Sequence, residues 1–401
     1  MPVPIFTEIL SKGFGIIPYF YTVLKTIPWI IGVWFLKIYF GGAKNRSERL
    51  MHGKVIMITG GTSGIGAAIV QNLAARGGQI VLLTHYSPSD PFLVDYIDDL
   101  RSTTGNEMIY AEKVDLSSLH EIRLFATKWV DNAPPRRLDM LILCANTMTP
   151  AYGKRHLTGD GLNEEWQVNY LANYHLLSIL SPALRAQPGD RDVRVIFATC
   201  SSYIGATLNL QSTTKMLKGS RAFGRSKLAL MIFAQAFQKH LDAYKRPDGF
   251  PNNSRVFVID PGLTRTPGMR RWLTGGTLFG LFIYIITYPF WWLVLKSPEQ
   301  GAQSFLKSAM EAEYGRNAGG RMIKECRDYE YLRREVKDEK VQKQLWKFSE
   351  QQVEQLEKAD AVKRALEKKE KEEAEKRKNK SSEGQGQQKK KEGSRRSKKA
   401  S

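Results

Sequence analysis

Short apolar segments alternate with helical patterns from His52 to about Cys326. The apolar segments read KVIMITG, QIVLLTH, MIYAEKVDL, LDMLILCAN, RVIFATCSS and RVFVIDPG. Each of them ends at a turn or a polar residue. Near-continuous apolar strands with helices between them are typical of a parallel sheet that is covered on both faces. The pattern therefore predicts an α/β fold with a doubly wound parallel sheet over residues 50–326, and GGRMI (319–323) as its last short strand.

A long apolar and aromatic run covers residues 13–43 and is interrupted by Lys25 and Lys37. It is too long and too aromatic for a signal peptide, and no small-residue cleavage site follows it. A bilayer core needs about 20 apolar residues, so residues 1–49 are predicted to hold a membrane anchor with a basic flank, either spanning or lying as an interfacial hairpin. The alternative is an apolar helix packed on the domain. The basic flank that follows places the main domain on the cytosolic side: Lys37, Lys44, Arg46, Arg49 and Lys54.

A second apolar run, residues 276–295, holds 20 residues without a charge. Its length alone indicates a transmembrane helix. However, the strand expected at 319–323 requires the chain to return to the side it left, and Pro289 breaks the run. We therefore expect a membrane-dipping hairpin or helix pair in preference to a full span or a buried core helix. Trp291 and Trp292 suit a membrane interface.

The C-terminal part is dense in Lys and Glu. Residues 327–378 are expected to form a charged helix, which either docks through a thin apolar stripe or stays solvated. Residues 379–401 are low in complexity and are expected to be disordered. This basic tail either contacts anionic lipid or only improves solubility.

Charge and cysteine content narrow the function class. The net charge is +20, but residues 376–401 carry eleven Lys or Arg against two Glu, and so account for +9 of it. This distribution indicates a basic tail near an anionic surface and argues against a nucleic-acid-binding domain. The three cysteines form no CxxC pair and no disulfide framework. The histidines show no HxxxH or HExxH spacing, so no metal site is expected.

The stretch VIMITGGTSGIGAAIV joins a strand to a helix through a glycine-rich turn. Gly60 allows a sharp turn, Gly64 removes a side chain where phosphates approach, and Gly66 lets the helix pack close to the strand. The helix N-terminus presents free N–H groups and partial positive charge to a pyrophosphate. The sequence therefore predicts a Rossmann-type dinucleotide site that also includes Thr62, Ser63 and Ile65. The alternative is a tight turn that uses its glycines for geometry alone.

The end of the second strand bears on which dinucleotide binds. An acidic residue there would favour NAD by bonding the ribose 2′-hydroxyl. His85 stands in that place, with Thr84 and Tyr86 as further donors for a 2′-phosphate. The sequence therefore favours NADP(H) over NAD.

Six further segments follow the glycine-rich TGGTSGIG in order: VDLSS, LILCAN, WQVNYLANYHLL, ATCSS, FGRSK and DPGLTRT. Together they resemble the short-chain dehydrogenase/reductase superfamily over about residues 50–325, and within it the membrane-associated branch related to retinol dehydrogenases and WW-domain oxidoreductases. The resemblance implies that Asp115 touches the adenine ring. It also implies that Pro261 and Gly262 lie by the nicotinamide, followed by Thr264. Asn146 stands where the family has a glycine beside the cofactor.

The same resemblance implies a catalytic set in which one member is missing. The family uses a tyrosine as acid and base, a lysine that lowers the tyrosine pKa and binds the ribose, a serine on the substrate oxygen, and an asparagine that anchors a water. Ser202, Lys227 and Asn169 match three of these, but Phe223 stands in place of the tyrosine. Cys200, Tyr203 or a water held by Ser202 and Lys227 are the candidates to fill in.

Two functional hypotheses follow. The first is a membrane-bound NADP(H)-dependent oxidoreductase that acts on a lipid-, sterol- or retinoid-like carbonyl, alcohol or C=C bond. An electron-poor C=C bond would need less help from a tyrosine, because carbon receives the hydride. The second is a nucleotide-binding pseudoenzyme that serves as a membrane scaffold or sensor. The family resemblance suggests the endoplasmic reticulum or a lipid droplet as location, and a homodimer as a possible assembly.

Overall fold

The computed structural model describes residues 19–150, 156–210 and 220–397. Within these residues the strands form one eight-stranded sheet in the order β3-β2-β1-β4-β5-β6-β7-β8. All neighbouring pairs are parallel except the last, β7 with β8. The strands are β1 (Val55–Thr59), β2 (Gln79–Thr84), β3 (Ile109–Lys113), β4 (Met140–Leu143), β5 (Val193–Ala198), β6 (Ser254–Asp260), β7 (Arg321–Lys324) and β8 (Arg327–Tyr329).

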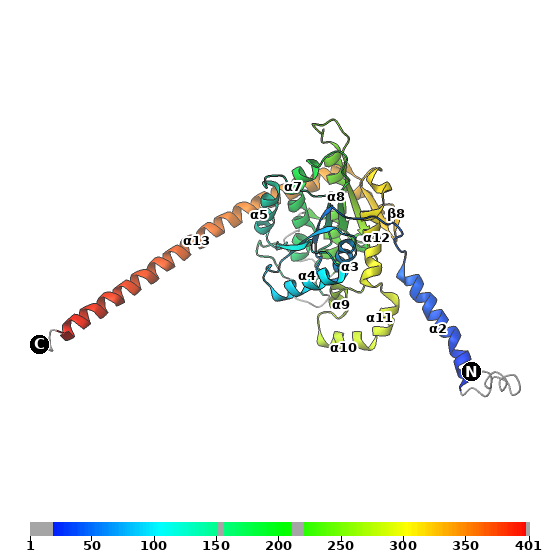
Figure 1. The fold of residues 1–401 in the computed structure, drawn as a ribbon, viewed down its shortest axis with the longest axis horizontal. Coiled ribbons are helices and arrows are strands. Elements are labelled where there is room, and N and C mark those ends of the chain that lie inside the picture. The colour runs from blue at the N-terminus through cyan, green and yellow to red at the C-terminus, as the bar shows by residue number, and fades with distance from the viewer. Residues whose placement is uncertain (1–18, 151–155, 211–219, 398–401) are drawn as a thin grey trace. The chain divides into compact units, whose positions relative to one another are not determined.

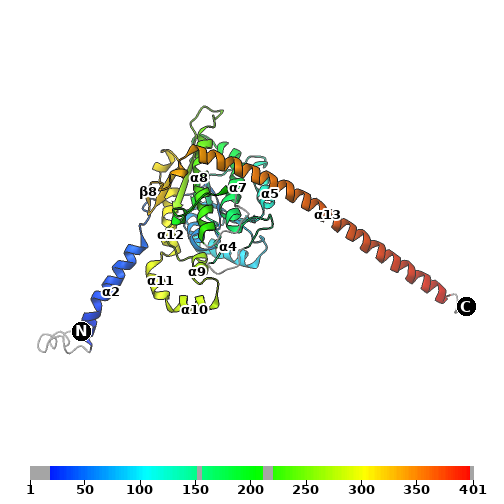
Figure 2. The ribbon, with the colours of Figure 1, turned by 180° about the vertical axis from the view of Figure 1, so that it is seen from behind.

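Helices cover both faces of this sheet, as Figures 1 and 2 show. One layer contains α3 (Gly64–Ala74), α4 (Pro91–Thr104) and α12 (Pro298–Met310). The other contains α5 (Leu119–Val130), α7 (Ala172–Arg185) and α8 (Ser220–Asp242). The direction of strand order reverses between β1 and β4, and the carboxyl ends of the strands on either side of such a reversal form the ligand crevice of open α/β sheets.

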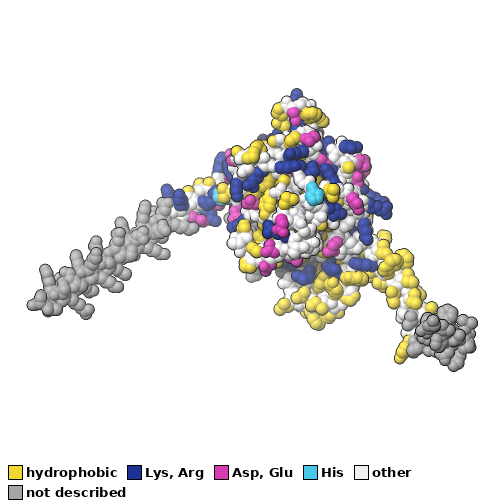
Figure 3. Space-filling model, in the orientation of Figure 1, with side chains coloured by type: hydrophobic (Ala, Val, Ile, Leu, Met, Phe, Trp, Pro, Cys, Tyr) yellow, Lys and Arg dark blue, Asp and Glu magenta, His cyan; other side chains and the backbone are white. Residues whose placement is uncertain are grey.

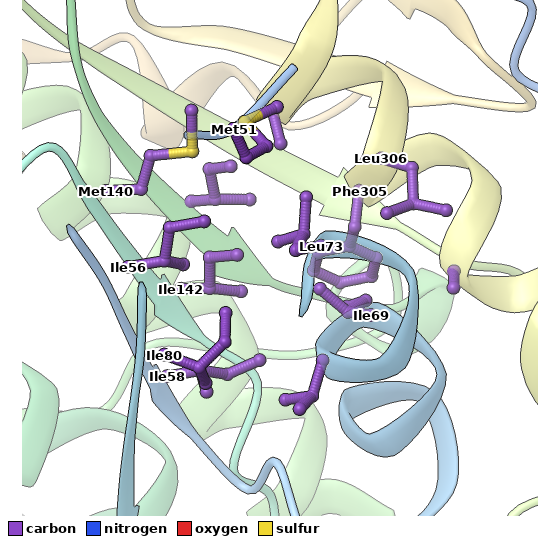
Figure 4. Close-up of a cluster of buried hydrophobic side chains, with 14 of the residues drawn as sticks. Met51, Ile56, Ile58, Ile69, Leu73, Ile80, Met140, Ile142, Phe305 and Leu306 are labelled. Atoms are coloured by element: carbon purple, nitrogen blue, oxygen red, sulfur yellow. The ribbon is translucent and has the colours of Figure 1, made fainter. Parts of the chain in front are cut away.

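Alternate residues of the strands pack beneath α3 and α12. Figure 4 shows Ile56 and Ile58 of β1, Ile80 of β2 and Ile142 of β4 near Leu73 of α3. Phe305 and Leu306 of α12 close the cluster from the side. The odd-numbered residues of β1 face the other helical layer and are buried as well. Burial on both faces explains why the strands read as continuous apolar runs.

The α/β expectation is confirmed, and each apolar segment named from the sequence forms a strand. The structure adds β8, which the sequence pattern did not indicate. Its three residues, Arg327 to Tyr329, are exposed and polar or aromatic. They pair with β7 through a two-residue turn at Glu325 and Cys326, so this strand depends on its neighbour and not on an apolar pattern of its own.

The apolar run 276–295 forms two short helices, α10 (Leu278–Ile286) and α11 (Tyr288–Val294), after the short α9 (Pro267–Leu273). The break falls at Thr287, and Pro289 lies in the first turn of α11, where its missing N–H costs no hydrogen bond. A helix pair was the favoured sequence expectation here. Figure 3 shows hydrophobic side chains gathered on the surface of this region.

The N-terminal apolar run forms α2 (Phe20–Gly41), which includes Pro28; residues 1–18 of the expected anchor lie outside the described residues. Helix α2 contacts α11: the ammonium group of Lys37 donates hydrogen bonds to the carbonyl oxygens of Trp292 and Leu295. Among the helices that the structure describes, none combines the length and the apolar character needed to cross a membrane.

The charged helix begins later and extends further than the sequence suggested. Strand β8 and a short 3-10 turn at Arg334–Val336 precede the helix, and α13 runs from Glu339 to Ser397. The helix therefore continues into the stretch that was expected to be disordered, up to residue 397. No proline follows Pro298 in the sequence, and pairs such as Glu354–Lys358 at 2.6 Å support the helix at i, i+4 spacing. Near its start, Trp346 packs against Tyr174 and Phe233 of α7 and α8.

Candidate functional site

The glycine-rich turn after β1 lies against the end of β4. Gly60 has φ +69°, a conformation that side chains disfavour. A Cβ on Gly60 would lie 2.7 Å from the Cα of Ala145. A Cβ on Gly66 would overlap the carbonyl oxygen of Gly60. These two glycines therefore allow the turn to sit at the strand reversal.

The N-terminus of α3 opens toward the segment that follows β6. Ser63 is the N-cap residue and has an extended backbone, but its side chain accepts no capping hydrogen bond. Gly64 has φ +57°, and a Cβ there would lie 3.1 Å from the Cγ2 of Thr266. Thr62 and Ile65 flank this opening. A helix N-terminus without a side-chain cap keeps its N–H groups available to an anion.

Two predicted cofactor residues, His85 and Asp115, lie at the neighbouring ends of β2 and β3. The strands pair Thr84 with Lys113, so His85 and Asp115 follow at the same edge of the sheet. His85 is exposed, and its ring lies 4.1 Å from that of Tyr86. Asp115 accepts hydrogen bonds from the backbone and the hydroxyl of Ser117, both at 2.8 Å. This carboxylate is therefore held by its own loop at the edge of the crevice.

The turn after β6 is held by a buried carboxylate. Gly262 has φ +74° and donates its N–H to Asp260 at 3.0 Å. Pro261 and Thr264 are buried in the same turn. A Cβ on Gly301 of α12 would lie 2.6 Å from the Oγ1 of Thr264 and 3.3 Å from Ile65. The segments that follow β1 and β6 therefore meet through the start of α12.

Lys227 lies in the interior of α8 and is 2% exposed. Its ammonium group donates to the carbonyl oxygen of Ala198 at 3.1 Å and lies 5.6 Å from the ring centroid of Phe223. Burial lowers the pKa of Lys227, and the nearby Cys200 and Cys144 act in the opposite direction. Phe223 is itself buried, one helical turn before the lysine. The sequence-predicted pair is therefore in contact, with an aromatic face in place of a phenol.

Ser202 lies in a 3-10 turn, Ser201–Tyr203, directly after β5. Its hydroxyl lies 2.8 Å from the Sγ of Cys200. Burial raises the pKa of the Cys200 thiol, although Lys227 and Ser202 oppose the shift. Burial also raises the pKa of Cys144 to about 11, so both thiols stay neutral near pH 7. Tyr203 points its hydroxyl toward Met322, at 4.0 Å from the sulfur, and not toward the site.

Asn169 lies in a π-helical turn, Gln167–Leu171, between the short α6 (Glu164–Trp166) and α7. Its Oδ1 accepts from the N–H of Thr147 at 2.8 Å, and its Nδ2 donates to the Thr147 carbonyl at 2.9 Å. The same Nδ2 donates to Ser226 of α8 at 3.2 Å. Asn169 thus joins the loop after β4 to the helix that carries Lys227. Turns of this kind are frequent at functional sites.

Asn146 is exposed in the loop after β4, one residue beyond Ala145, which adjoins Gly60. The residues predicted to be catalytic and those predicted to hold the phosphates therefore lie together near the carboxyl ends of β1, β4, β5 and β6. Sequence reasoning missed Asp260 and Lys324, which are paired at 3.1 Å. Asp260 stood within the DPG motif, so a buried carboxylate at that place could have been suspected. Lys324 is the last residue of the short β7, and no motif in the sequence pointed to it.

Comparison with known proteins agrees with this arrangement. The family model described as short chain dehydrogenase matches residues 54–275. The chain is 40% identical to an uncharacterised oxidoreductase, pbr1, of Schizosaccharomyces pombe over 89% of this chain and 97% of that protein. It is 28% identical to mouse retinol dehydrogenase 13, covering 79% of this chain and 88% of the relative. It is 29% identical to mouse polyprenol dehydrogenase, covering 73% and 82%.

Proposed function

The chain belongs to the short-chain dehydrogenase family of oxidoreductases, in its retinol dehydrogenase-like branch, and from that premise we propose that it is a membrane-bound, NADP(H)-dependent oxidoreductase acting on a hydrophobic alcohol, carbonyl or C=C substrate. The observation that carries the proposal is the buried Lys227, whose ammonium group lies between the ring of Phe223 and the carbonyl oxygen of Ala198 at the end of β5. A lysine buried at the ligand end of the sheet has a desolvation cost that a purely structural role does not require.

The residues at the strand ends fit a dinucleotide. Gly60 and Gly64 leave open backbone where side chains would obstruct it, and the uncapped start of α3 suits a pyrophosphate. His85 and Asp115 would hold the adenosine half, and Lys227 would hold the nicotinamide ribose. When bound, NADP(H) supplies the hydride.

The chain must then supply or accept a proton without a tyrosine. We assign this role to Lys227, with Ser202 holding the substrate oxygen. Because burial lowers the pKa of Lys227, its ammonium group releases a proton more readily than a free lysine. A water held between Ser202 and Lys227 would carry the proton. Cys200 and Cys144 are poorer candidates, because burial raises the pKa of both thiols.

The surface next to the site supports a substrate that arrives from a membrane, with the endoplasmic reticulum as the proposed location. Gly276, just before α10, lies close to Pro150 in the loop after β4. Helices α10 and α11 expose a set of large apolar side chains: Leu278, Phe279, Phe282, Ile283, Ile285, Ile286 and Phe290. An apolar patch of this kind beside a site suits a lipid surface. Retinol and polyprenol, named in two relatives, are hydrophobic alcohols and are the first substrates to try.

The test of this function follows the hydride itself. The purified protein in lipid nanodiscs receives NADPH deuterated at the nicotinamide C4 position, together with a total lipid extract, and lipids are then analysed by mass spectrometry. Deuterium in a lipid product, lost in a Lys227 variant, supports the oxidoreductase. NADPH binding without any transfer would favour the alternative, a cofactor-sensing pseudoenzyme, which the buried Phe223 suggests.

The choice of cofactor gives a second prediction. Replacing His85 with aspartate is expected to weaken NADPH binding relative to NADH by at least about tenfold, because a carboxylate repels a 2′-phosphate and accepts from a 2′-hydroxyl. The measurement is the ratio of the two dissociation constants. His52→Asp serves as a control, since His52 packs on Gly77, before the amino end of β2. An unchanged ratio in His85→Asp would place the ribose elsewhere.

Membrane association gives a third prediction. A chain lacking residues 1–43 is expected to keep part of its affinity for lipid vesicles. Each large apolar side chain of α10 that moves from water into the lipid contributes about 1.5–3 kcal/mol to the binding free energy. Vesicle flotation measures this affinity. The double substitution Phe279→Asp and Phe282→Asp in the shortened chain should abolish flotation. A shortened chain that stays entirely in the aqueous fraction would show that α10 and α11 do not bind lipid.

A further inference from the structure

The turn between β7 and β8 has an unusual backbone for its residues. Lys324 pairs with Arg327, and the two residues between them, Glu325 and Cys326, have φ +51° and φ +54°. Two-residue hairpin turns with positive φ at both positions favour Asn and Gly, because a Cβ is disfavoured in that region. Such a conformation at non-glycine residues persists where surrounding contacts determine it, and it often marks a functional element.

The side chains of Glu325 and Cys326 bind the backbone of Ala43, which follows the end of α2. The Glu325 carboxylate accepts from the N–H of Ala43 at 3.0 Å, and the Cys326 thiol donates to the carbonyl oxygen of Ala43 at 3.8 Å. The N–H of Cys326 is in turn fixed by the hydroxyl of Ser304 in α12, at 3.1 Å. Both backbone polar groups of Ala43 are thus bound by the turn. Gly42 has φ +72°, and a Cβ there would overlap Glu325 and Lys296.

The preceding residue of the same hairpin reaches the catalytic end. Lys324 bonds to Asp260 and to the hydroxyl of Ser201, each at 3.1 Å. Asp260 is 1% exposed and accepts from Ser201 at 2.8 Å and from the N–H of Gly262 at 3.0 Å. One carboxylate therefore holds both the turn that carries Ser202 and the turn beside the predicted nicotinamide position.

A second connection passes through Lys296, which forms an ion pair with Glu325. The backbone of Lys296 donates to Leu263 at 3.0 Å and accepts from Arg265 at 2.9 Å. Its ammonium group would lie 3.3 Å from a Cβ on Gly262. The residue before it, Leu295, accepts from Lys37 of α2 at 3.3 Å. Helix α2 thus connects to the segment after β6 both through Glu325 and through the end of α11.

We propose that the β7–β8 turn couples the engagement of α2 with a lipid bilayer to NADP(H) binding, which makes Glu325 and Lys324 positioning residues of the site. The inference rests on the proposed function. When α2 is held by lipid, Ala43 stays on Glu325, and Lys296 and Lys324 keep the segments after β5 and β6 in their binding arrangement. When α2 is free to move, these contacts are lost. Coupling is reciprocal, so bound NADP(H) also strengthens membrane attachment.

The partner that covers α2 is inferred from the pattern of its exposed side chains. Trp29, Ile30, Val33 and Phe35 are all exposed, and these positions point in different directions around the helix. A single protein partner would cover one face. An apolar medium covers every side, so a bilayer is the partner that matches this pattern.

The experiment uses the full chain and measures the dissociation constant of NADPH by fluorescence, with and without vesicles of phosphatidylcholine. The wild-type protein is expected to bind NADPH at least about fivefold more tightly on vesicles, the lower end of usual coupling strengths. The Glu325→Gln protein is expected to float with vesicles as the wild type does, but its NADPH dissociation constant should change less than twofold when vesicles are added. The matched control is Asp328→Asn, which weakens the Arg321–Asp328 pair at the other end of the same hairpin and should keep the full change.

Gly42→Ala tests the same contact from the side of the linker, where a failure to fold is not expected because the glycine precedes the domain. It should also remove the vesicle effect. A vesicle effect that is retained in both Glu325→Gln and Gly42→Ala, or that is absent in the wild-type protein, overturns the coupling. Absence of NADPH binding under every condition overturns the proposed function itself, and the coupling with it.

Discussion

Replacing Phe223 with tyrosine is expected to raise the rate of carbonyl reduction by about 10²- to 10⁴-fold, the usual contribution of a positioned acid or base. Phe223 is buried one helical turn before Lys227, whose ammonium group lies 5.6 Å from the centre of the ring. A phenol added to this ring would lie beside a positive charge, which lowers a tyrosine pKa. The gain is expected because Lys227 already lies over the ring, and because the turn that carries Ser202 packs against Gly224, the next residue of the helix.

The measurement is NADPH-dependent reduction of retinal in detergent micelles, a probe chosen because retinol dehydrogenases are among the relatives. Phe223→Leu is the control, since it changes the ring but adds no acid and should give no gain. A Phe223→Tyr protein that binds NADPH normally and still reduces nothing would show that the substrate does not reach Ser202. A gain for an aldehyde but not for a conjugated C=C bond would identify the bond type that the native residue favours.

Replacing Lys227 with methionine is expected to weaken NADPH binding by about 10- to 150-fold without loss of stability. The loss corresponds to hydrogen bonds from a charged group, which are worth about 1.5–3 kcal/mol. Stability should hold because methionine fills a similar volume and removes a buried charge. Titration calorimetry measures the affinity for NADPH, and thermal unfolding measures the stability. Lys239→Met, an exposed position on the same helix, should change neither.

The pH dependence of the same variant supplies an independent check. Burial lowers the pKa of Lys227 in the folded protein below its ordinary value of 10.5. The folded state therefore binds fewer protons than the unfolded chain between the folded pKa and about 10.5, and this group makes stability rise with pH across that window. The rise should be smaller in Lys227→Met. Equal slopes in the two proteins, with equal NADPH affinity, would mean that Lys227 is neither buried as a charge nor part of the cofactor site.

Local chemistry explains why much of the fold was predictable. Strands β1, β2 and β4–β6 are buried on both faces, so each appears in the sequence as an apolar run that ends at a turn. Gly60 and Gly64 have positive φ, and Gly60 also lies against Ala145. The glycine pattern of this short turn was therefore enough to predict the phosphate end of the site. The order of the candidate catalytic residues was visible because Ser202 follows a strand, while Phe223 and Lys227 lie four residues apart on one helix.

Contacts between distant segments were not predictable. Strand β8 has no apolar pattern and exists because β7 offers an edge. The later start of α13 follows from the residues that β8 and the turn at Arg334–Val336 occupy. Asp260 and Lys324 are 64 positions apart and meet because β6 and β7 are neighbours in the sheet.

Short stretches of the chain were enough to predict the parallel α/β sheet, the glycine-rich turn and the replacement of a tyrosine by Phe223, since periodicity, glycine placement and residue identity are local properties. The groups around Lys227, and the contacts by which Ala43, Glu325 and Lys296 join α2 to the segment after β6, depend on how distant segments pack. One of those contacts joins the backbone of Ala43 to the side chain of Glu325, 282 positions away, and only the packing of the whole sheet and its helices sets such distances.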